Sequence, residues 1–240
     1  MLHLIPFDGA GNLGAGTPRD ELSLRKTIIQ ACLNMNARGF NQGKSGNISA
    51  RWGRGILITP SGLPYDQMQP EDLAFMPLDG DYGSWSGPFV PSTEWRFHVD
   101  IMQARPEVGA VVHTHSLYAT VLAICEREIP AIHYNVAMCG GPTVRVAPYA
   151  TFGTKELSEN ALKALDGRKC CLLSHHGTIS VGPDVQRALA LAEELENLAK
   201  QYYLTAQLGG ARILPDDEIA TVMERTKNYW VAKPSKAAAE

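Results

Sequence analysis

An apolar run, GAVVHTH, ends on two histidines spaced two residues apart, His113 and His115. Along a β-strand the side chains alternate between the two faces, so residues i and i+2 point to the same side. The sequence therefore predicts a buried strand at 109–114 whose end presents two imidazoles to one place. A catalytic zinc takes three protein ligands and keeps one position for water or substrate. The rest of the chain would have to supply the third ligand.

A second histidine pair, His175 and His176, follows another apolar run, KCCLL. Adjacent strand residues face opposite ways, so at most one of the two can join a shared site. A single histidine is more often a core or surface residue than a ligand. Two pairs, each at the C-terminal end of an apolar run, favour a metal site.

Glu94, in PSTEWRFH, is expected in the first turn of a helix that begins at Ser92 or Thr93. A carboxylate at this position can simply interact with the helix dipole. It can also act as a general base, or as a fourth metal ligand that leaves when substrate arrives. Spacing alone does not separate these roles.

Three short loops combine glycine with small hydroxyl or amide side chains: SGN at 45–47, PSG at 60–62 and PST at 91–93. Approachable backbone N–H groups of this kind, beside a helix N-terminus, can form a phosphate site without a lysine. Ordinary turn chemistry gives the same composition. The presence of three such loops beside a candidate base favours a phosphate site.

The composition is that of a globular protein, with 45% hydrophobic and 20% charged residues among 240. A formal net charge of −3 gives no electrostatic basis for binding nucleic acid or an anionic membrane. The five cysteines are scattered and are expected to be reduced thiols. The sequence has no signal-peptide pattern and no apolar run of membrane-spanning length. We expect a cytoplasmic protein that binds neither nucleic acid nor membrane.

Periodicity predicts one catalytic domain over 21–230, with a flexible arm at 1–20 and a flexible tail at 231–240. These patterns favour an α/β sandwich and leave the strand directions open. Helices are expected at 21–38, 92–105, 116–125, 154–165, 183–208 and 216–227. Strands are expected at 47–52, 55–60, 109–114, 130–134, 143–148 and 169–176.

Seven motifs in order resemble the class II aldolase/adducin family, and most closely its L-fuculose-phosphate aldolase branch. The resemblance spans about residues 21–230 and rests on NQGKSGNIS, ITPSGLPY, PSTEWRFH, VVHTH, IPAIHY, APYATFGT and LLSHHG. It implies a three-layer α/β/α sandwich around a mainly antiparallel central sheet. It also implies a homotetramer with active sites between neighbouring subunits.

The resemblance further implies residue roles. Zinc, with manganese or cobalt as other candidates, would be held by His113, His115, His176 and Glu94, and Glu94 would also be the acid/base group. Tyr134 from the neighbouring subunit and Tyr229 near the C-terminus would assist catalysis, and Phe152 would form a wall of the aldehyde pocket. The substrate phosphate would bind at Asn47, Ser61, Gly62, Ser92 and Thr93. Ser61 and Thr93 depart from the usual threonine and serine, but each exchange keeps the hydroxyl.

The implied reaction is cleavage of a ketose 1-phosphate to dihydroxyacetone phosphate and an aldehyde. The substrate would be L-fuculose 1-phosphate or a related deoxy- or methylthio-pentulose 1-phosphate. Three alternatives remain open: a sugar-phosphate 4-epimerase, whose pattern generally has aspartate at Glu94, a methylthioribulose 1-phosphate dehydratase, and an adducin-like scaffold. The scaffold relatives lack the metal histidines that this chain carries.

Overall fold

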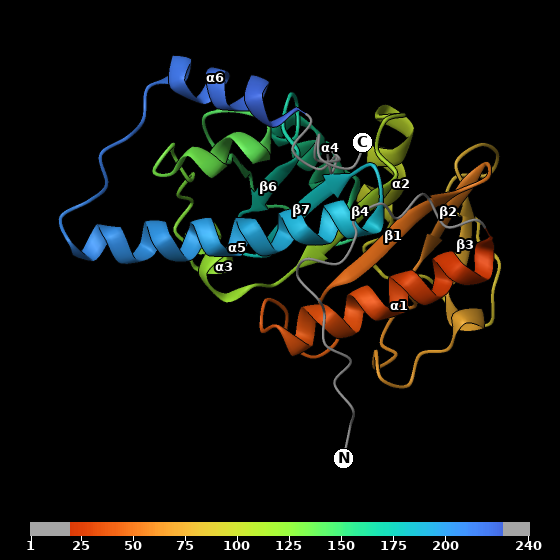
Figure 1. The fold of residues 1–240 in the computed structure, drawn as a ribbon. Coiled ribbons are helices and arrows are strands. Elements are labelled where there is room, and N and C mark those ends of the chain that lie inside the picture. The colour runs from red at the N-terminus through yellow and green to blue at the C-terminus, as the bar shows by residue number, and fades with distance from the viewer. Residues whose placement is uncertain (1–19, 228–240) are drawn as a thin grey trace, which may run out of the picture.

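The protein is described here by a computed structural model of residues 20–227 (Figure 1). Within this range one seven-stranded sheet has the order β3-β2-β1-β4-β7-β6-β5. Neighbouring strands are antiparallel except for the pair β5–β6. The strands are β1 (Asn47–Trp52), β2 (Gly55–Ile58), β3 (Ala74–Pro77), β4 (Ala110–Thr114), β5 (Val146–Ala147), β6 (Cys170–Leu173) and β7 (Gly177–Gly182). The predicted, mainly antiparallel sheet is confirmed.

Helices cover both faces of this sheet, which gives the three layers (Figure 1). Helices α2 and α4 pack on one face, while α1, α3 and α5 pack on the other. The described helices are α1 (Glu21–Ala37), α2 (Trp95–Ala104), α3 (Leu117–Ile124), α4 (Lys155–Ala164), α5 (Val185–Gln207) and α6 (Asp216–Thr226), with short 3-10 helices η1 (Pro70–Asp72) and η2 (Tyr134–Cys139). None of these helices is both long and apolar enough to cross a membrane.

Strand β4 lies at the centre of the sheet and supplies side chains to both layers. Val111 packs with α2 and α4, whereas Ala110 and Val112 pack with α1 and α5. The alternation continues to His113, which lies on the α2 side with its ring against Phe97 at a centroid distance of 5.4 Å. The two-residue period of the strand therefore determines on which side of the sheet the histidines gather.

Several helix ends follow from the sequence. Gly39 has a φ of 78° just past the end of α1, a conformation that glycine adopts without steric cost. Thr154 caps α4 by accepting a hydrogen bond from the Leu157 backbone N–H at 3.2 Å. The β1–β2 hairpin closes through Gly53, whose φ is 53°.

The prediction of a strand at 130–134 is wrong. Ile129 makes only an isolated bridge to Val144, and the chain then enters η2 at Tyr134. Pro130 cannot donate to a strand ladder, and η2 buries Val136 against helices instead. This apolar segment belongs to the helical layer. Short-range periodicity cannot distinguish such a segment from a strand.

Strands β3 and β7 were not predicted. In β7 the buried positions include Thr178 and Ser180, so the strand lacks the apolar signature of a core element. The Thr178 hydroxyl is satisfied at 2.8 Å by Thr114 on the neighbouring strand. The run predicted as a strand to 176 ends at Leu173, and the next three residues form the turn into β7.

Candidate active site

Glu94, His113, His115 and His176 come together from three parts of the chain, with one ligand atom of each lying within 4.8 Å of all the others. The Nε2 atoms of His113 and His115 are 2.9 Å apart. The Glu94 oxygens reach His113 Nε2 at 3.1 Å and His176 Nε2 at 2.9 Å. Four donors around one zinc ion are spaced by roughly 3.4 Å, so this cluster has the dimensions of a metal site.

Each ligand reaches the cluster from the end of an element. His113 and His115 lie at the C-terminal end of β4, and His176 lies in the turn between β6 and β7. His113 Nδ1 is 2.8 Å from the Thr178 carbonyl oxygen, to which it donates. This bond leaves the Nε2 lone pair of the neutral ring facing the cluster, as in metal-binding histidines.

The donor set fits a divalent cation. Three imidazole nitrogens and a carboxylate converge in a region where His113 is fully buried and Glu94 is 6% exposed. Glu94 Oε1 is buried and accepts no well-aligned hydrogen bond. Lone pairs at these distances repel unless a proton or a cation lies between them, and imidazole with carboxylate is a donor set that suits zinc.

The electrostatics of the cluster also favour a cation. Burial alone would raise the pKa of the Glu94 carboxyl, but the charges and hydrogen bonds of His113 and His176 outweigh it and hold that pKa below its usual range. Burial would lower the pKa of His113, yet contact with Glu94 raises it. Burial, together with His113 and His176, lowers the pKa of His115 to about 4. The cluster thus holds a carboxylate beside an imidazole that stays neutral at physiological pH.

Behind Glu94 lies a chain of buried polar side chains that the sequence reasoning missed. The Asn47 amide nitrogen donates to Glu94 Oε2 at 2.8 Å, and Asn47 Oδ1 is 2.5 Å from His98 Nε2. His98 Nδ1 in turn lies 2.7 Å from Ser49 Oγ. His98 is fully buried, and burial together with the nearby His113 lowers its pKa to about 3. The available signal was the i, i+4 spacing in EWRFH, which places Glu94 and His98 on one helix face.

The loops predicted to bind phosphate lie next to one another. Ser61 N donates to Val90 O at 3.0 Å, and Ser92 N donates to Thr59 O at 2.9 Å, which joins the second loop to the third. Lys44, which directly precedes the first loop, donates to Gly62 O at 2.7 Å. Of the predicted residues, Gly62 and Thr93 are exposed, Ser61 is half-buried, and Asn47 and Ser92 are buried. The sequence reasoning did not consider Lys44.

The start of α2 differs from the prediction by one or two residues. Glu94, rather than Ser92 or Thr93, occupies the N-cap position, and its side chain makes no capping hydrogen bond. The Glu94 backbone N–H donates instead to Ser92 Oγ at 3.2 Å. Ser92 therefore supports the turn that aims the Glu94 carboxylate at the histidines.

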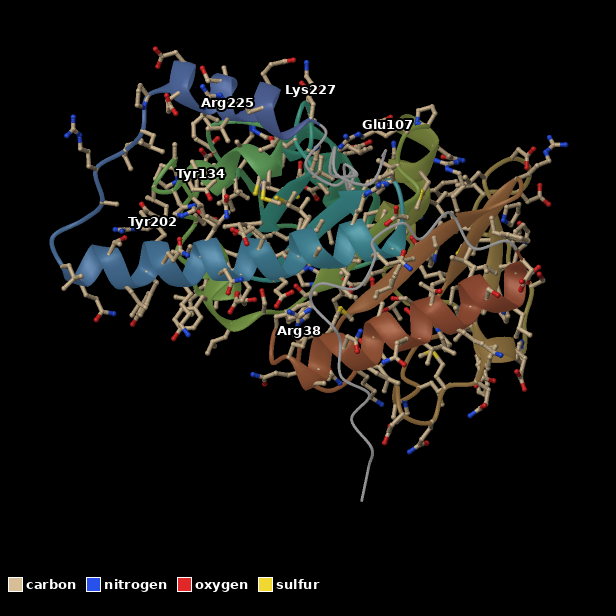
Figure 2. All side chains as sticks on the ribbon, in the orientation of Figure 1. Arg38, Glu107, Tyr134, Tyr202, Arg225 and Lys227 are labelled. Atoms are coloured by element: carbon tan, nitrogen blue, oxygen red, sulfur yellow. The ribbon has the colours of Figure 1, made fainter. Side chains whose placement is uncertain are left out.

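The remaining predicted residues are exposed side chains or lie outside the described range. Tyr134 is 53% exposed and begins η2, which packs against α5 and α6 (Figure 2). Phe152 is 62% exposed in the loop before α4. A Cβ on Gly153 would lie 2.9 Å from the Thr93 carbonyl oxygen, so the Phe152 loop packs closely on the third loop. Tyr229 lies outside the described residues.

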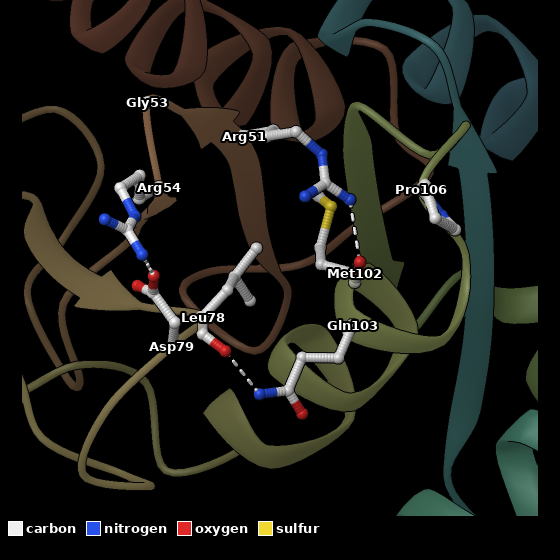
Figure 3. Close-up of a pocket in the computed structure, with 8 residues that line it drawn as sticks. All are labelled: Arg51, Gly53, Arg54, Leu78, Asp79, Met102, Gln103 and Pro106. Atoms are coloured by element: carbon white, nitrogen blue, oxygen red, sulfur yellow. Dashed lines mark hydrogen bonds and ion pairs between the residues drawn. The ribbon is translucent and has the colours of Figure 1, made fainter.

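Two surface pockets differ in their relation to the cluster. One of about 440 Å³ reaches His115. Its other lining residues come from the 42–45 segment and from α3: Gln42, Ser45, Leu117, Thr120, Val121 and Ile124. The other, of about 360 Å³, lies at the far ends of β1 and α2 (Figure 3). There Arg51 donates to the Met102 and Val108 carbonyls and Arg54 pairs with Asp79, so both cations already have partners. Of these two pockets, the first touches a residue of the cluster, His115, and the second touches none.

Comparisons with known proteins agree with this geometry. The family model described as Class II Aldolase and Adducin N-terminal domain matches residues 26–203. A 5-methylthioribulose-1-phosphate/5-deoxyribulose-1-phosphate aldolase of Rhodospirillum rubrum is 50% identical over 88% of this chain and 95% of its own length. An L-fuculose phosphate aldolase of Escherichia coli is 45% identical over 86% of this chain and 95% of its own.

A solved structure of an L-fuculose 1-phosphate aldolase superposes with a TM-score of 0.81 at 35% identity, covering 85% of this chain and 96% of that one. These comparisons indicate a class II aldolase. The cluster of three imidazoles and a carboxylate supplies the metal site that such an enzyme needs. The chain belongs to the class II aldolase/adducin family and is a metal-dependent aldolase.

Proposed function

We propose that this aldolase is zinc-dependent and cleaves a ketose 1-phosphate to dihydroxyacetone phosphate and an aldehyde. One observation carries the proposal: a buried carboxylate, Glu94, lies between a three-histidine cluster and three loops suited to phosphate. The phosphate loops and the cluster share the N-terminus of α2. A substrate anchored by its phosphate would thus reach the cluster with its adjoining carbons.

The metal ligands in this proposal are His113, His115 and His176, with Glu94 as a fourth ligand that substrate displaces. A bound zinc ion would supply Lewis acidity, which stabilises the negative charge that develops on the ketose oxygens as a carbon–carbon bond breaks. Manganese or cobalt could occupy the same imidazole-rich donor set, because such sites discriminate weakly among these ions. The partial exposure of His115 and His176 leaves the cluster open on one side.

The phosphate would bind where the three loops meet. Ser61, Thr93 and Gly62 offer hydroxyl and backbone N–H donors, and the start of α2 adds the positive end of a helix dipole. Lys44 already lies over Gly62, so its ammonium can pair with a phosphate oxygen. Asn47 uses one N–H on Glu94 and keeps a second donor for the ligand.

Two side chains would move protons. As the C3–C4 bond breaks, the C4 hydroxyl proton passes to Tyr134 of a neighbouring subunit, and C4 leaves as the aldehyde. Glu94, which is ionised before substrate binds, takes up the proton that Tyr134 passes on and then delivers it to C3, which completes dihydroxyacetone phosphate. Tyr229 would assist from the C-terminal segment, and Phe152 would form one wall of the aldehyde pocket. The exposure of Tyr134 at η2 is compatible with a role across a subunit boundary.

This arrangement requires active sites between subunits, and we propose that the protein is a homotetramer that works in the cytoplasm. The relatives with 50% and 45% identity act on methylthio- or deoxyribulose 1-phosphate and on L-fuculose phosphate. These substrates share the phosphate and the ketose carbons and differ in the aldehyde half. We propose that the substrate comes from this set.

A panel of ketose phosphates tests the proposal. The zinc-loaded protein is incubated separately with 5-deoxyribulose 1-phosphate, 5-methylthioribulose 1-phosphate, L-fuculose 1-phosphate and L-ribulose 5-phosphate. Release of dihydroxyacetone phosphate from one or more of the 1-phosphates is the expected result. Conversion of L-ribulose 5-phosphate to its 4-epimer, or loss of water from methylthioribulose 1-phosphate, without triose release from any 1-phosphate would contradict it.

A further inference from the structure

A buried ladder of four polar side chains joins β1 to α2 beside the metal cluster. Asn47 and Ser49 are two residues apart on β1, so both face α2. Glu94 and His98 are four residues apart, one helical turn, and both face β1. The four residues are at most 6% exposed. The ladder is therefore shielded from solvent, and its polar groups must find their partners among other protein groups.

The direction of every hydrogen bond in the ladder follows from Glu94. An ionised carboxylate can only accept, so Asn47 must present its NH2 group to Glu94 and its carbonyl to His98. His98 must then carry its proton on Nε2 to donate to that carbonyl. Its Nδ1 is left as an acceptor for the Ser49 hydroxyl.

The opposite orientation of the Asn47 amide would also satisfy His98. In that case the amide would donate to Nε2, and the His98 proton would lie on Nδ1, facing Ser49. The Asn47 carbonyl would then face the Glu94 carboxylate, and two acceptors would repel each other. Without His98, the Asn47 carbonyl would lose its buried donor, and the amide could turn out of line with the Glu94 carboxylate.

We propose that His98 is a positioning residue that holds the Asn47 amide in the orientation that Glu94 requires and thereby fixes the position of the Glu94 carboxylate. This inference rests on the proposed function for the roles of Asn47 and Glu94. The Asn47 nitrogen has two N–H groups, one on Glu94 and one free for the substrate phosphate. His98 thus aligns the acid/base group and the phosphate donor together without touching the substrate.

The tautomer of His98 gives a test that needs no substrate. The measurement is 15N solid-state NMR of histidine-labelled, metal-free protein at neutral pH, with the His98 signals assigned from their loss in His98→Gln. The expected result is a neutral ring protonated on Nε2. A neutral ring protonated on Nδ1 would overturn the proposal, since it requires the reversed amide. This outcome is independent of which sugar phosphate is cleaved.

A double-mutant cycle tests whether His98 acts through Asn47. His98→Leu should lower kcat/KM by about 10- to 100-fold in the otherwise unchanged protein, the usual range for residues that support metal ligands. In an Asn47→Ala background the same change should cost less than about threefold, because the interaction it supports is already lost. Equal losses in both backgrounds would show a general packing role and contradict the proposal.

Two further variants serve as a rescue and as a control for this cycle. His98→Gln can place an N–H near the former Nε2, so it should recover most of the activity that His98→Leu loses. Met102→Leu changes another fully buried side chain one turn along α2 and should leave kcat/KM unchanged. Failure of the unaltered protein to cleave any ketose phosphate would count against the proposed function, and the NMR result would still test His98.

Discussion

At the residue scale, the side chain of Glu94 resolves an ambiguity that its sequence position leaves open. A carboxylate at an N-cap normally accepts a hydrogen bond from the first turn, but Glu94 makes none. Its oxygens lie instead at 3.1 Å from His113 Nε2 and 2.9 Å from His176 Nε2. The helix forgoes a capping interaction worth about 1 kcal/mol. A carboxylate that contacts the histidines instead of capping the helix is expected where the residue serves the chemistry rather than the stability of the fold.

Replacing Glu94 by Gln tests this role. Gln keeps the shape and a carbonyl oxygen but cannot exchange a proton, so kcat should fall by roughly 100-fold or more while zinc stays bound at the histidines. Steady-state kinetics and metal analysis of the same sample measure both. Glu107→Gln, an exposed carboxyl beyond the far end of α2, is the matched control. Full activity in Glu94→Gln would remove this residue from the mechanism.

Lys44 carries a separate prediction at the same scale. Its ammonium lies 2.7 Å from the Gly62 carbonyl, where the loops proposed to bind phosphate meet. Lys44→Met should raise KM about three- to tenfold with little change in kcat, because an exposed charge-assisted hydrogen bond contributes modestly. Lys26→Met, at an exposed lysine on α1, should change neither constant. A fall in kcat at unchanged KM would place Lys44 elsewhere in the reaction.

At the scale of elements, local patterns predicted the helices and most strands with apolar faces, but missed the short apolar strand β3. The end of β4 was predicted correctly because alternation alone fixes the side to which His113 and His115 point. Strand β7 was missed because polar Thr178 and Ser180 occupy buried positions, which only the neighbouring strand explains. The same limit applied to His98, whose partners lie about 50 positions away in the sequence and are brought close only by the fold.

The β4–β7 pairing sets the geometry of the cluster. The space around Gly177 shows how tightly the two strands pack there. A Cβ at this position would lie 2.4 Å from the Thr114 carbonyl oxygen and 2.9 Å from the His115 ring. Gly177→Ala should therefore lower the free energy of unfolding by about 1–3 kcal/mol, the range for overpacking, and weaken metal binding. Chemical denaturation and a metal-chelator competition measure these effects.

Ser180→Ala is the control for Gly177→Ala. It lies on the same strand, and its buried hydroxyl has no hydrogen-bond partner. This change should leave both stability and metal affinity close to those of the original protein. A harmless Gly177→Ala would show that the pairing of β4 with β7 tolerates more movement than the contacts indicate.

At the scale of the whole molecule, the seven motifs predicted the family, the sheet and the cluster together. Tyr134 is the residue that a single chain does not explain, since its side chain is 53% exposed at the start of η2. No pattern along the sequence reports which surface meets another subunit. Only the resemblance to the family supplied the expectation that this tyrosine acts across a subunit boundary.

Hybrid oligomers test that expectation. Co-expressed Glu94→Gln and Tyr134→Phe chains each lack one group, yet a site that takes Glu94 from one chain and Tyr134 from its neighbour is intact. Random mixing of equal amounts should restore about one quarter of the original activity, since each site has one favourable pairing in four. Activity no higher than that of the separate variants would show that Tyr134 does not act across the interface.

Stoichiometric reconstitution tests most directly the claim that three histidines and Glu94 hold the ion on which cleavage depends. Chelated, metal-free protein is titrated with zinc while dihydroxyacetone phosphate release from the best ketose 1-phosphate is recorded. The account predicts no activity without metal and a linear rise that ends at one zinc per chain. Activity that persists in the metal-free protein, or that does not respond to added divalent metal, would contradict it.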